Sequence, residues 1–203
     1  MDHKYLQDAI TLFVVLNPIG AVPLYLGLTR GMDRRERLGV ARRACIAATI
    51  ILLVFIALGE IVLDGMGVHL PSFRVAGGLV LLLVALRMVL GSATDVASGR
   101  EETRDVAIFP LATPFLAGPG SIIAAVLLTE NEHFTILEQA TTGLVVAGIL
   151  ALTYALLASA DVLQRVIGTM GAVLMSRVLG LILAALAMQT MMDGLRPYLE
   201  SLR

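Results

Sequence analysis

The sequence predicts an all-α integral membrane protein with six transmembrane helices, arranged as two inverted three-helix repeats with broken first and fourth helices. Three observations predict this fold class: the composition, six apolar stretches of membrane-spanning length, and a proline motif that occurs twice. Hydrophobic residues make up 58% of the 203 residues and charged residues 15%, with a mean hydropathy of +0.88. These values lie outside the range of soluble domains. Trp is absent and aromatic residues are only 5%, so the aromatic girdles of a membrane barrel are missing and helices are expected to cross the bilayer.

Composition also excludes several classes of function. The 15 basic and 16 acidic residues give a net charge of −1, which argues against a broadly basic nucleic-acid-binding protein. The single cysteine, Cys45, forms no intrachain disulfide and builds no cysteine-rich metal centre. His3, His69 and His133 lack ligand-like spacing and read as loop histidines. No phosphate-binding loop occurs, and no apposed aspartates or zinc motif lie in the apolar stretches, so neither an enzyme nor a cofactor is expected.

Six apolar stretches account for most of the chain. A helix needs about 20 residues to cross the hydrocarbon core. The stretches cover residues 9–29, 44–63, 74–90, 106–129, 139–160 and 177–192. The third begins at Arg74 and contains Arg87 near its exit, and the sixth begins at Arg177. Glu60 is the only acid inside a predicted span, so no deeply buried carboxylate is expected and ion coupling is left open. Short loops without a linker predict a single transmembrane domain, 1–203.

The basic residues predict the orientation, because loops rich in Lys and Arg stay in the cytoplasm. Ten of them fall in the first, third and fifth loops: Arg30, Arg34, Arg35, Arg37, Arg42, Arg43, Arg100, Arg104, Arg165 and Arg177. The opposite side holds four: Lys4, Arg74, Arg196 and Arg203. Arg87 is left out of the count because it lies within a predicted span. The excess of basic residues places the first, third and fifth loops in the cytoplasm, so both termini are predicted to be periplasmic.

Two segments repeat the pattern [Asn/Thr]-Pro-x4-Pro, at 17–23 and 113–119. A second pair of segments follows in the same order, because Phe73-Arg74-Val75-Ala76-Gly77 aligns with Ser176-Arg177-Val178-Leu179-Gly180. These pairs define repeat one as 1–95 and repeat two as 105–203. Each repeat holds an odd number of spans, so the second copy enters the membrane from the opposite side. Chance coincidence of Pro, Gly and Val explains one pair more readily than two pairs in order.

The repeated motif predicts a binding site. Two prolines five residues apart, with nearby glycines, interrupt a helix, and irregular backbone at membrane depth is tolerated where it lines a cavity. Free half-helix ends and small polar side chains suit a small zwitterion. The candidate substrate-binding residues are Asn17, Pro18, Gly20, Thr113, Pro114, Gly118, Gly120 and Ser121. The alternative is a pair of ordinary proline kinks satisfied by neighbouring helices.

Two matched arginines and three glycines have further interpretations. Arg74 and Arg177 stand at the starts of the third and sixth spans, on opposite sides of the membrane. They either gate a cavity or anchor the helices at the interface. Gly77, Gly78 and Gly180 are expected to let helices approach closely rather than to bind a ligand.

The sequence resembles the MarC family of bacterial inner-membrane proteins, which includes the SnatA-type small neutral amino-acid transporters. The resemblance covers nearly the whole chain and rests on residues 17–26, on Phe73-Arg74-Val75-Ala76-Gly77-Gly78, and on residues 110–121. Tyr25 stands where the family more often has Phe. The resemblance implies six helices in two inverted triplets and, for some members, transport of glycine, alanine and similar amino acids.

Together these features predict a secondary transporter or exporter of small neutral amino acids that works by alternating access. The expected partners are these amino acids and the lipid bilayer, with no nucleic acid; the expected location is a bacterial inner membrane. The sequence leaves the oligomeric state open. Two alternatives remain: an intramembrane enzyme, or a membrane subunit that transports nothing itself.

Overall fold

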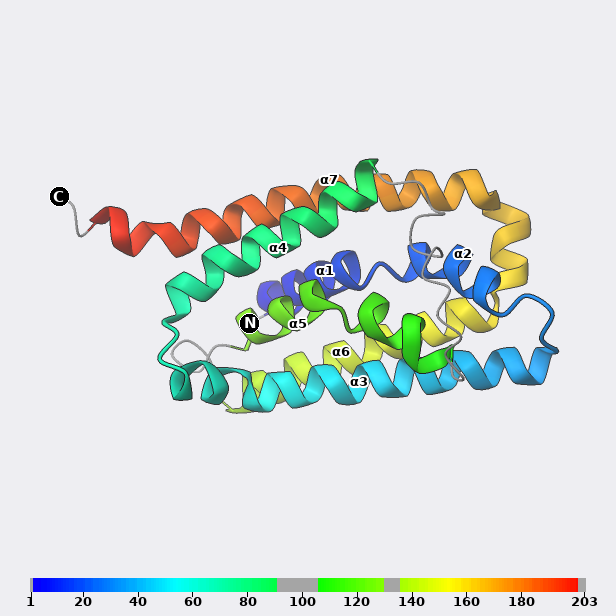
Figure 1. The fold of residues 1–203 in the computed structure, drawn as a ribbon, viewed down its shortest axis with the longest axis horizontal. Coiled ribbons are helices and arrows are strands. Elements are labelled where there is room, and N and C mark those ends of the chain that lie inside the picture. The colour runs from blue at the N-terminus through cyan, green and yellow to red at the C-terminus, as the bar shows by residue number, and fades with distance from the viewer. Residues whose placement is uncertain (1, 91–105, 130–135, 201–203) are drawn as a thin grey trace.

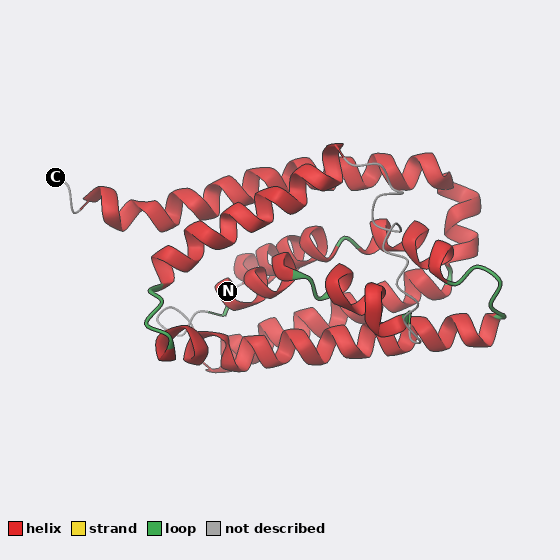
Figure 2. Cartoon of the chain, viewed as in Figure 1, coloured by secondary structure: helices red, strands yellow, loops and turns green. Residues whose placement is uncertain are grey.

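The fold was analysed in a computed structural model, which describes residues 2–90, 106–129 and 136–200 (Figure 1). Every regular element in these ranges is helical (Figure 2). In chain order they are α1 (Asp2–Leu16), α2 (Pro18–Leu28), α3 (Arg34–Gly65), α4 (Leu70–Leu90), η1 (Ala107–Leu116), α5 (Pro119–Leu127), α6 (Ile136–Ala158) and α7 (Ala160–Glu200). The all-helical part of the prediction is therefore confirmed for the described residues.

Five stretches of helix within the described residues are long and apolar enough to cross a membrane. They are Asp8–Leu28, Arg34–Gly59, Leu70–Leu90, Gln139–Ala158 and Met170–Glu200. The predicted span at 106–129 is divided into η1, of 10 residues, and α5, of 9 residues. Neither is long enough to cross a membrane by itself, because hydrocarbon about 30 Å thick takes about 20 helical residues.

The helices form two long outer pairs with the short segments between them (Figure 1). Helices α4 and α7 pack side by side along one edge, and α3 and α6 lie along the opposite edge. The broken segments α1–α2 and η1–α5 lie between these pairs. The backbone interruptions of these segments are therefore enclosed by the long outer helices.

The interior consists of two hydrophobic clusters. The larger joins α1, α2, α3, η1 and α6, and its fully buried side chains include Leu12, Tyr25, Leu52, Leu111 and Leu150. The smaller joins α1, α4, α5 and α7 through residues such as Val15, Leu81 and Leu183. The short segments contribute to both clusters, which fixes the helix breaks relative to the outer pairs.

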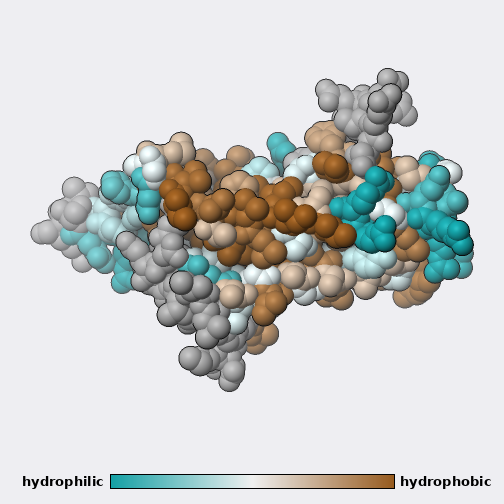
Figure 3. Space-filling model, turned by 90° about the horizontal axis from the view of Figure 1, so that it is seen from below, coloured by the Kyte–Doolittle hydropathy of each residue, from teal (hydrophilic) through white to brown (hydrophobic). Residues whose placement is uncertain are grey.

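The outer face of α3 is apolar and exposed. Its exposed side chains include Ile46, Ile50, Val54, Leu58 and Ile61. Seen from the α3 side, hydrophobic side chains form a band across the middle of the molecule, with hydrophilic side chains towards the ends (Figure 3). Such a band matches the hydrocarbon layer of a bilayer.

Helix α7 is longer than the predicted span of 177–192. It runs from Ala160 to Glu200 and bends at Gly168, whose backbone adopts φ 70° and ψ 169°. Arg177 lies inside the helix instead of at its start, and its side chain is exposed. The predicted span was bounded at Arg177 because that residue is charged. Arg is a good helix former, however, and its long side chain can carry the charge away from apolar surroundings, so the helix continues through it.

Glycines allow α4 and α7 to pack closely, as expected. A Cβ on Gly78 would lie 2.8 Å from the carbonyl oxygen of Ala187, and one on Gly180 would lie 3.2 Å from the carbonyl oxygen of Ala85. The two contacts are reciprocal, since each helix places a glycine against the backbone of the other. The interpretation of Gly78 and Gly180 as packing residues is confirmed.

Candidate substrate cavity between two helix breaks

The first break lies at Asn17, between α1 and α2. Asn17 adopts φ 45° and ψ 59°, the left-handed region that Asn tolerates better than most residues. Its amide still donates to the carbonyl of Phe13 at 3.1 Å, and its side-chain Oδ1 accepts from the amide of Gly20 at 3.1 Å. Pro18 has no amide with which to continue the ladder of α1. One residue therefore ends α1 and caps α2.

The second break is produced by residues that precede prolines. Thr113 precedes Pro114 and has φ −126° and ψ 131°, and Gly118 precedes Pro119 and has φ −84° and ψ 174°. The proline ring disfavours the helical conformation in the residue before it and favours extended backbone. The segment from η1 to α5 is therefore interrupted at both positions, and the predicted breaks in the first and fourth segments are present.

A cavity of about 440 Å³ lies between the two breaks. This volume falls within the range of small-molecule sites, about 300–1,000 Å³. Its walls come from α1, α2, α4, η1, α5 and α7. The lining residues are Val15, Leu16, Asn17, Gly20, Pro23, Leu24, Val80, Leu83, Val84, Arg87, Met88, Phe115, Pro119, Ala172, Val173 and Ser176. Both broken segments thus contribute to one space.

The cavity wall is mainly apolar and carries three polar side chains among its described residues: Asn17, Ser176 and Arg87. Asn17 is 7% exposed, and its Nδ2 donates to Ser176 Oγ at 3.5 Å, which links the first break to α7. Gly20 stands beside this pair, and a Cβ on it would collide with the side chain of Asn17 and lie 2.7 Å from Ser176 Oγ. Only glycine leaves room for this contact.

Two half-helix ends border the cavity with opposite polarity. The C-terminal end of α1 contributes Val15 and Leu16 to the wall and carries the negative end of a helix dipole. The N-terminal end of α5 contributes Pro119, and its N-cap residue Gly118 provides no side-chain cap. That end carries the positive end of a dipole. A molecule with one positive and one negative group fits between such ends.

Two polar residues of this wall were absent from the candidates predicted from the sequence. Ser176 lies in the segment that was used to align the two repeats, where only Arg177 and Gly180 were given roles, and Arg87 was set aside in the charge count. Arg87 lies seven residues after Val80 and four after Leu83, on one face of α4. That helical spacing was visible in the sequence, but which helix face bordered a cavity was not.

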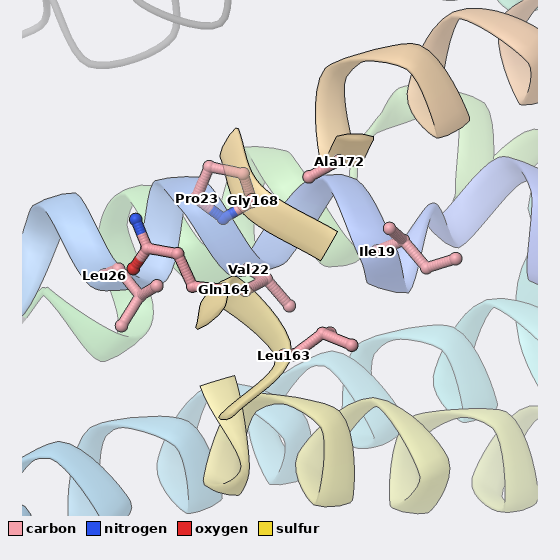
Figure 4. A pocket seen from close by; sticks show the side chains of 8 residues that line it. All are labelled: Ile19, Val22, Pro23, Leu26, Leu163, Gln164, Gly168 and Ala172. Carbon is pink, nitrogen blue, oxygen red and sulfur yellow. The ribbon is translucent and has the colours of Figure 1, made fainter. Parts of the chain in front are cut away.

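A second, much smaller pocket adjoins the cavity between α2 and the bend of α7 (Figure 4). Its volume of about 10 Å³ holds about one water molecule. Pro23 and Ala172 line both spaces. The other lining residues are Ile19, Val22 and Leu26 of α2 and Leu163, Gln164 and Gly168 of α7.

The predicted site residues fall into two groups. Asn17 and Gly20 line the cavity, and Pro18 is buried next to them. Thr113, Gly118, Gly120 and Ser121 are not part of its wall, although Thr113 and Gly118 form the second break. Thr113 Oγ1 donates to the carbonyl of Ile108 at 3.1 Å, and Ser121 is 2% exposed. Pro114 contributes to the break through its effect on the backbone of Thr113.

The two candidate gating arginines lie apart from the cavity wall. Arg74 is partly buried near the start of α4, where its Cβ lies beside Gly194 of α7, and Arg177 is exposed on α7. Arg74 therefore packs against the partner helix, while Arg177 projects from the surface.

A buried carboxylate lies at the very start of the first candidate span, outside the stretches in which Glu60 was the only acid. Asp8 is the first residue of the first candidate span and is 2% exposed. Its Oδ2 accepts a hydrogen bond from Thr142 Oγ1 at 2.9 Å, and Thr142 of α6 is fully buried. The uncharged stretch began at residue 9, so the criterion that defined the span left Asp8 outside it.

Comparisons with known proteins agree with this architecture. The sequence profile described as MarC family integral membrane protein matches residues 3–199. A UPF0056 membrane protein of Methanocaldococcus jannaschii is 39% identical over 202 residues, covering 97% of this chain and 98% of that protein. The UPF0056 inner membrane protein YhgN of Escherichia coli is 28% identical, covering 98% and 99%. A UPF0056 membrane protein of Aquifex aeolicus is 30% identical, covering 97% and 94%.

No solved structure matches the chain significantly. The family match and the relatives nevertheless extend over almost the whole sequence, including both broken segments and the helices around the cavity. The chain therefore belongs to the MarC family of integral membrane proteins.

Proposed function

We propose that this protein is a secondary transporter or exporter of small neutral amino acids. The observation that carries the proposal is that two interrupted membrane segments border a single cavity of about 440 Å³. Broken helices that meet near the middle of a membrane protein form the substrate sites of many secondary transporters, because their free ends supply charge complementarity without ionised side chains.

The chemistry of the wall favours a zwitterion with a small apolar side chain. An α-ammonium group suits the carbonyl end of α1, and an α-carboxylate suits the amide end of α5. The amide of Asn17 and the hydroxyl of Ser176 offer hydrogen bonds, whereas Val80, Val84 and Phe115 surround the remaining space with apolar surface. The described lining residues include no acid, so the wall disfavours substrates with a cationic side chain.

The mechanism that we propose is alternating access by two inverted repeats. The two halves follow the same order: a broken segment (α1–α2, η1–α5), a long helix (α3, α6) and a final long helix (α4, α7). The reciprocal glycine contacts between α4 and α7 support a pseudo-two-fold relation. We propose that repeat one (1–95) and repeat two (105–203) rock against each other and expose the cavity to each side in turn.

The proposed setting is the plasma membrane, with both termini outside the cytoplasm. A relative in Escherichia coli is named an inner membrane protein, which supports the location. The orientation follows from the basic residues of the first loop and the start of α3, a region that contains Arg30, Arg34, Arg35 and Arg37.

The test is uptake of radiolabelled glycine and alanine into proteoliposomes that contain the purified protein. The proposal predicts uptake above empty liposomes that unlabelled substrate competes away. Absence of uptake across a panel of neutral amino acids, in both directions of each imposed gradient, would remove it. The same absence is expected if the protein is an intramembrane enzyme or a subunit that transports nothing.

A further inference from the structure

We propose that Arg87 binds the α-carboxylate of the substrate together with the amide end of α5, and that its formal charge sets specificity for free amino acids. This inference rests on the proposed transport function and adds a substrate-contacting side chain to it. Its basis is one side chain: Arg87 is the only charged residue among the described residues that line the cavity.

The fold places Arg87 on the cavity-facing side of α4. Val80, Leu83, Val84 and Met88 share this side with it, at intervals of three and four residues. The stripe from Val80 to Met88 extends over about 12 Å of helix axis. Arg87 lies in the last turn of α4, which ends at Leu90, and it follows the apolar residues that this helix contributes to the wall.

Within the described part of the chain, Arg87 forms no ion pair. Other arginines there do: Arg37 contacts Asp161 at 3.1 Å, and Arg196 contacts Glu200 at 3.1 Å. Arg87 is exposed, and among the described lining residues it supplies the only formal charge to which an anion in the cavity can bind. The cavity thus provides a cationic point without a matching acid among its lining residues.

The guanidinium group matches a carboxylate in shape as well as charge. Two parallel N–H groups bond both carboxylate oxygens, a geometry that the ammonium group of lysine cannot reproduce. The amide end of α5 attracts any acceptor, including the carbonyl of an amide, because it supplies partial charges only. The formal charge of Arg87 favours a free amino acid, which has a carboxylate, over a derivative such as an amide, in which that group is neutral.

The same guanidinium would also suit a lipid phosphate. The cavity wall favours the amino acid, because Asn17 and Ser176 add polar groups from the helix break to the same space. A phosphate bound at the membrane interface would not involve these two side chains.

The experiment compares alanine with alaninamide, which lacks the carboxylate, as competitors of labelled glycine uptake in proteoliposomes. The variants are Arg87→Gln, Arg87→Lys and the control Arg196→Gln, which removes an exposed arginine of α7 that does not line the cavity. In wild type, alanine is expected to compete at least about ten-fold better than alaninamide. Arg87→Gln is expected to weaken competition by alanine about ten- to a hundred-fold while alaninamide changes less than about three-fold.

Arg87→Lys keeps the charge and is expected to fall between wild type and Arg87→Gln, whereas Arg196→Gln should match wild type. If Arg87→Gln fails to insert into the membrane, the Arg87→Lys variant still tests the inference. Equal weakening for both competitors, or unchanged competition in a monodisperse Arg87 variant, would overturn the inference. A response that depends only on the anionic lipid content of the vesicles would assign Arg87 to lipid and overturn it as well. In either case uptake by the wild type would leave the proposed function standing; no uptake by the wild type would remove both.

Discussion

At the scale of single residues, Gly20 is the position in the first break that least tolerates an added side chain. A Cβ there would collide with the Asn17 side chain, which caps α2 and contacts Ser176. We predict that Gly20→Ala weakens apparent substrate affinity by at least about ten-fold, because the Asn17 amide must turn away from the cavity. The measurement is substrate competition in proteoliposomes.

Gly27→Ala is the matched control, since Gly27 lies on the same helix and a Cβ there meets nothing within 4 Å. Alanine at that exposed position should leave affinity unchanged and raise stability by up to about 1 kcal/mol, through its higher helix propensity. Equal effects of the two substitutions on affinity would contradict the role assigned to Gly20.

The buried pair Asp8 and Thr142 provides a second test at this scale. Thr142→Val removes a hydrogen bond to a buried carboxylate, and we predict a loss of about 1–3 kcal/mol in the free energy of unfolding. Thr153→Val on the same helix is the control, because Thr153 is equally buried but donates only to the carbonyl of Ile149 in its own helix. Denaturation of both variants in the same detergent measures the difference, and a loss no greater for Thr142→Val than for Thr153→Val would refute it.

At the scale of elements, the breaks were predictable because each follows from local chemistry. Prolines at 114 and 119 impose extended backbone on the residues before them, and no tertiary information is needed to see this. Asn17 departs from that rule by adopting a left-handed conformation before Pro18. Its side chain bonds the amide of Gly20, and this local bond offsets the cost of the conformation.

The bounds of the long helices were less predictable. Charges marked the expected ends of spans, but α3 begins at Arg34, ten residues before the predicted start, and α7 passes through Arg177. Asp33 caps α3 by accepting from the amide of Glu36 at 2.8 Å. Such a cap extends a helix into the interfacial region, beyond the part that its apolar residues define.

The pairing of α4 with α7 yields a prediction for these elements. Gly78→Ala places a methyl group 2.8 Å from the carbonyl oxygen of Ala187, so we predict a loss of about 1–3 kcal/mol in stability from overpacking. Gly148→Ala on α6 is the control, since a Cβ there has open space. Thermal unfolding of the two purified variants gives the comparison. A Gly78→Ala protein as stable as wild type would show that the two helices separate easily.

At the scale of the whole molecule, the orientation can be tested without knowledge of the substrate. We predict that alkaline phosphatase fused after Arg203 is active in a Gram-negative host, since the enzyme folds only outside the cytoplasm. A fusion within 95–105, a segment outside the described residues, should be inactive. The reverse pattern would show that the protein lies the other way round in the membrane.

The cavity could not have been predicted completely from one sequence. Asn17 and Gly20 were found because a proline motif marks them. Ser176 and Arg87 were missed because they join the cavity only through the packing of α4 and α7 around the first break. Their positions depend on contacts between residues far apart in the chain, such as the one from Asn17 to Ser176.

The central claim, that this cavity holds a small neutral amino acid, is tested most directly by protection of a cysteine placed in its wall. Cys45 is buried, so a Cys45→Ala background carrying Ser176→Cys presents one reactive thiol at the cavity. Ser72→Cys serves as the control, because Ser72 lies near the start of α4 and outside the cavity wall, which α4 borders only from Val80 to Met88. Alanine at about ten times its Kd should slow modification of the thiol at 176 about ten-fold and leave the thiol at 72 unaffected. Equal rates at 176 with and without every small neutral amino acid tested would contradict the claim.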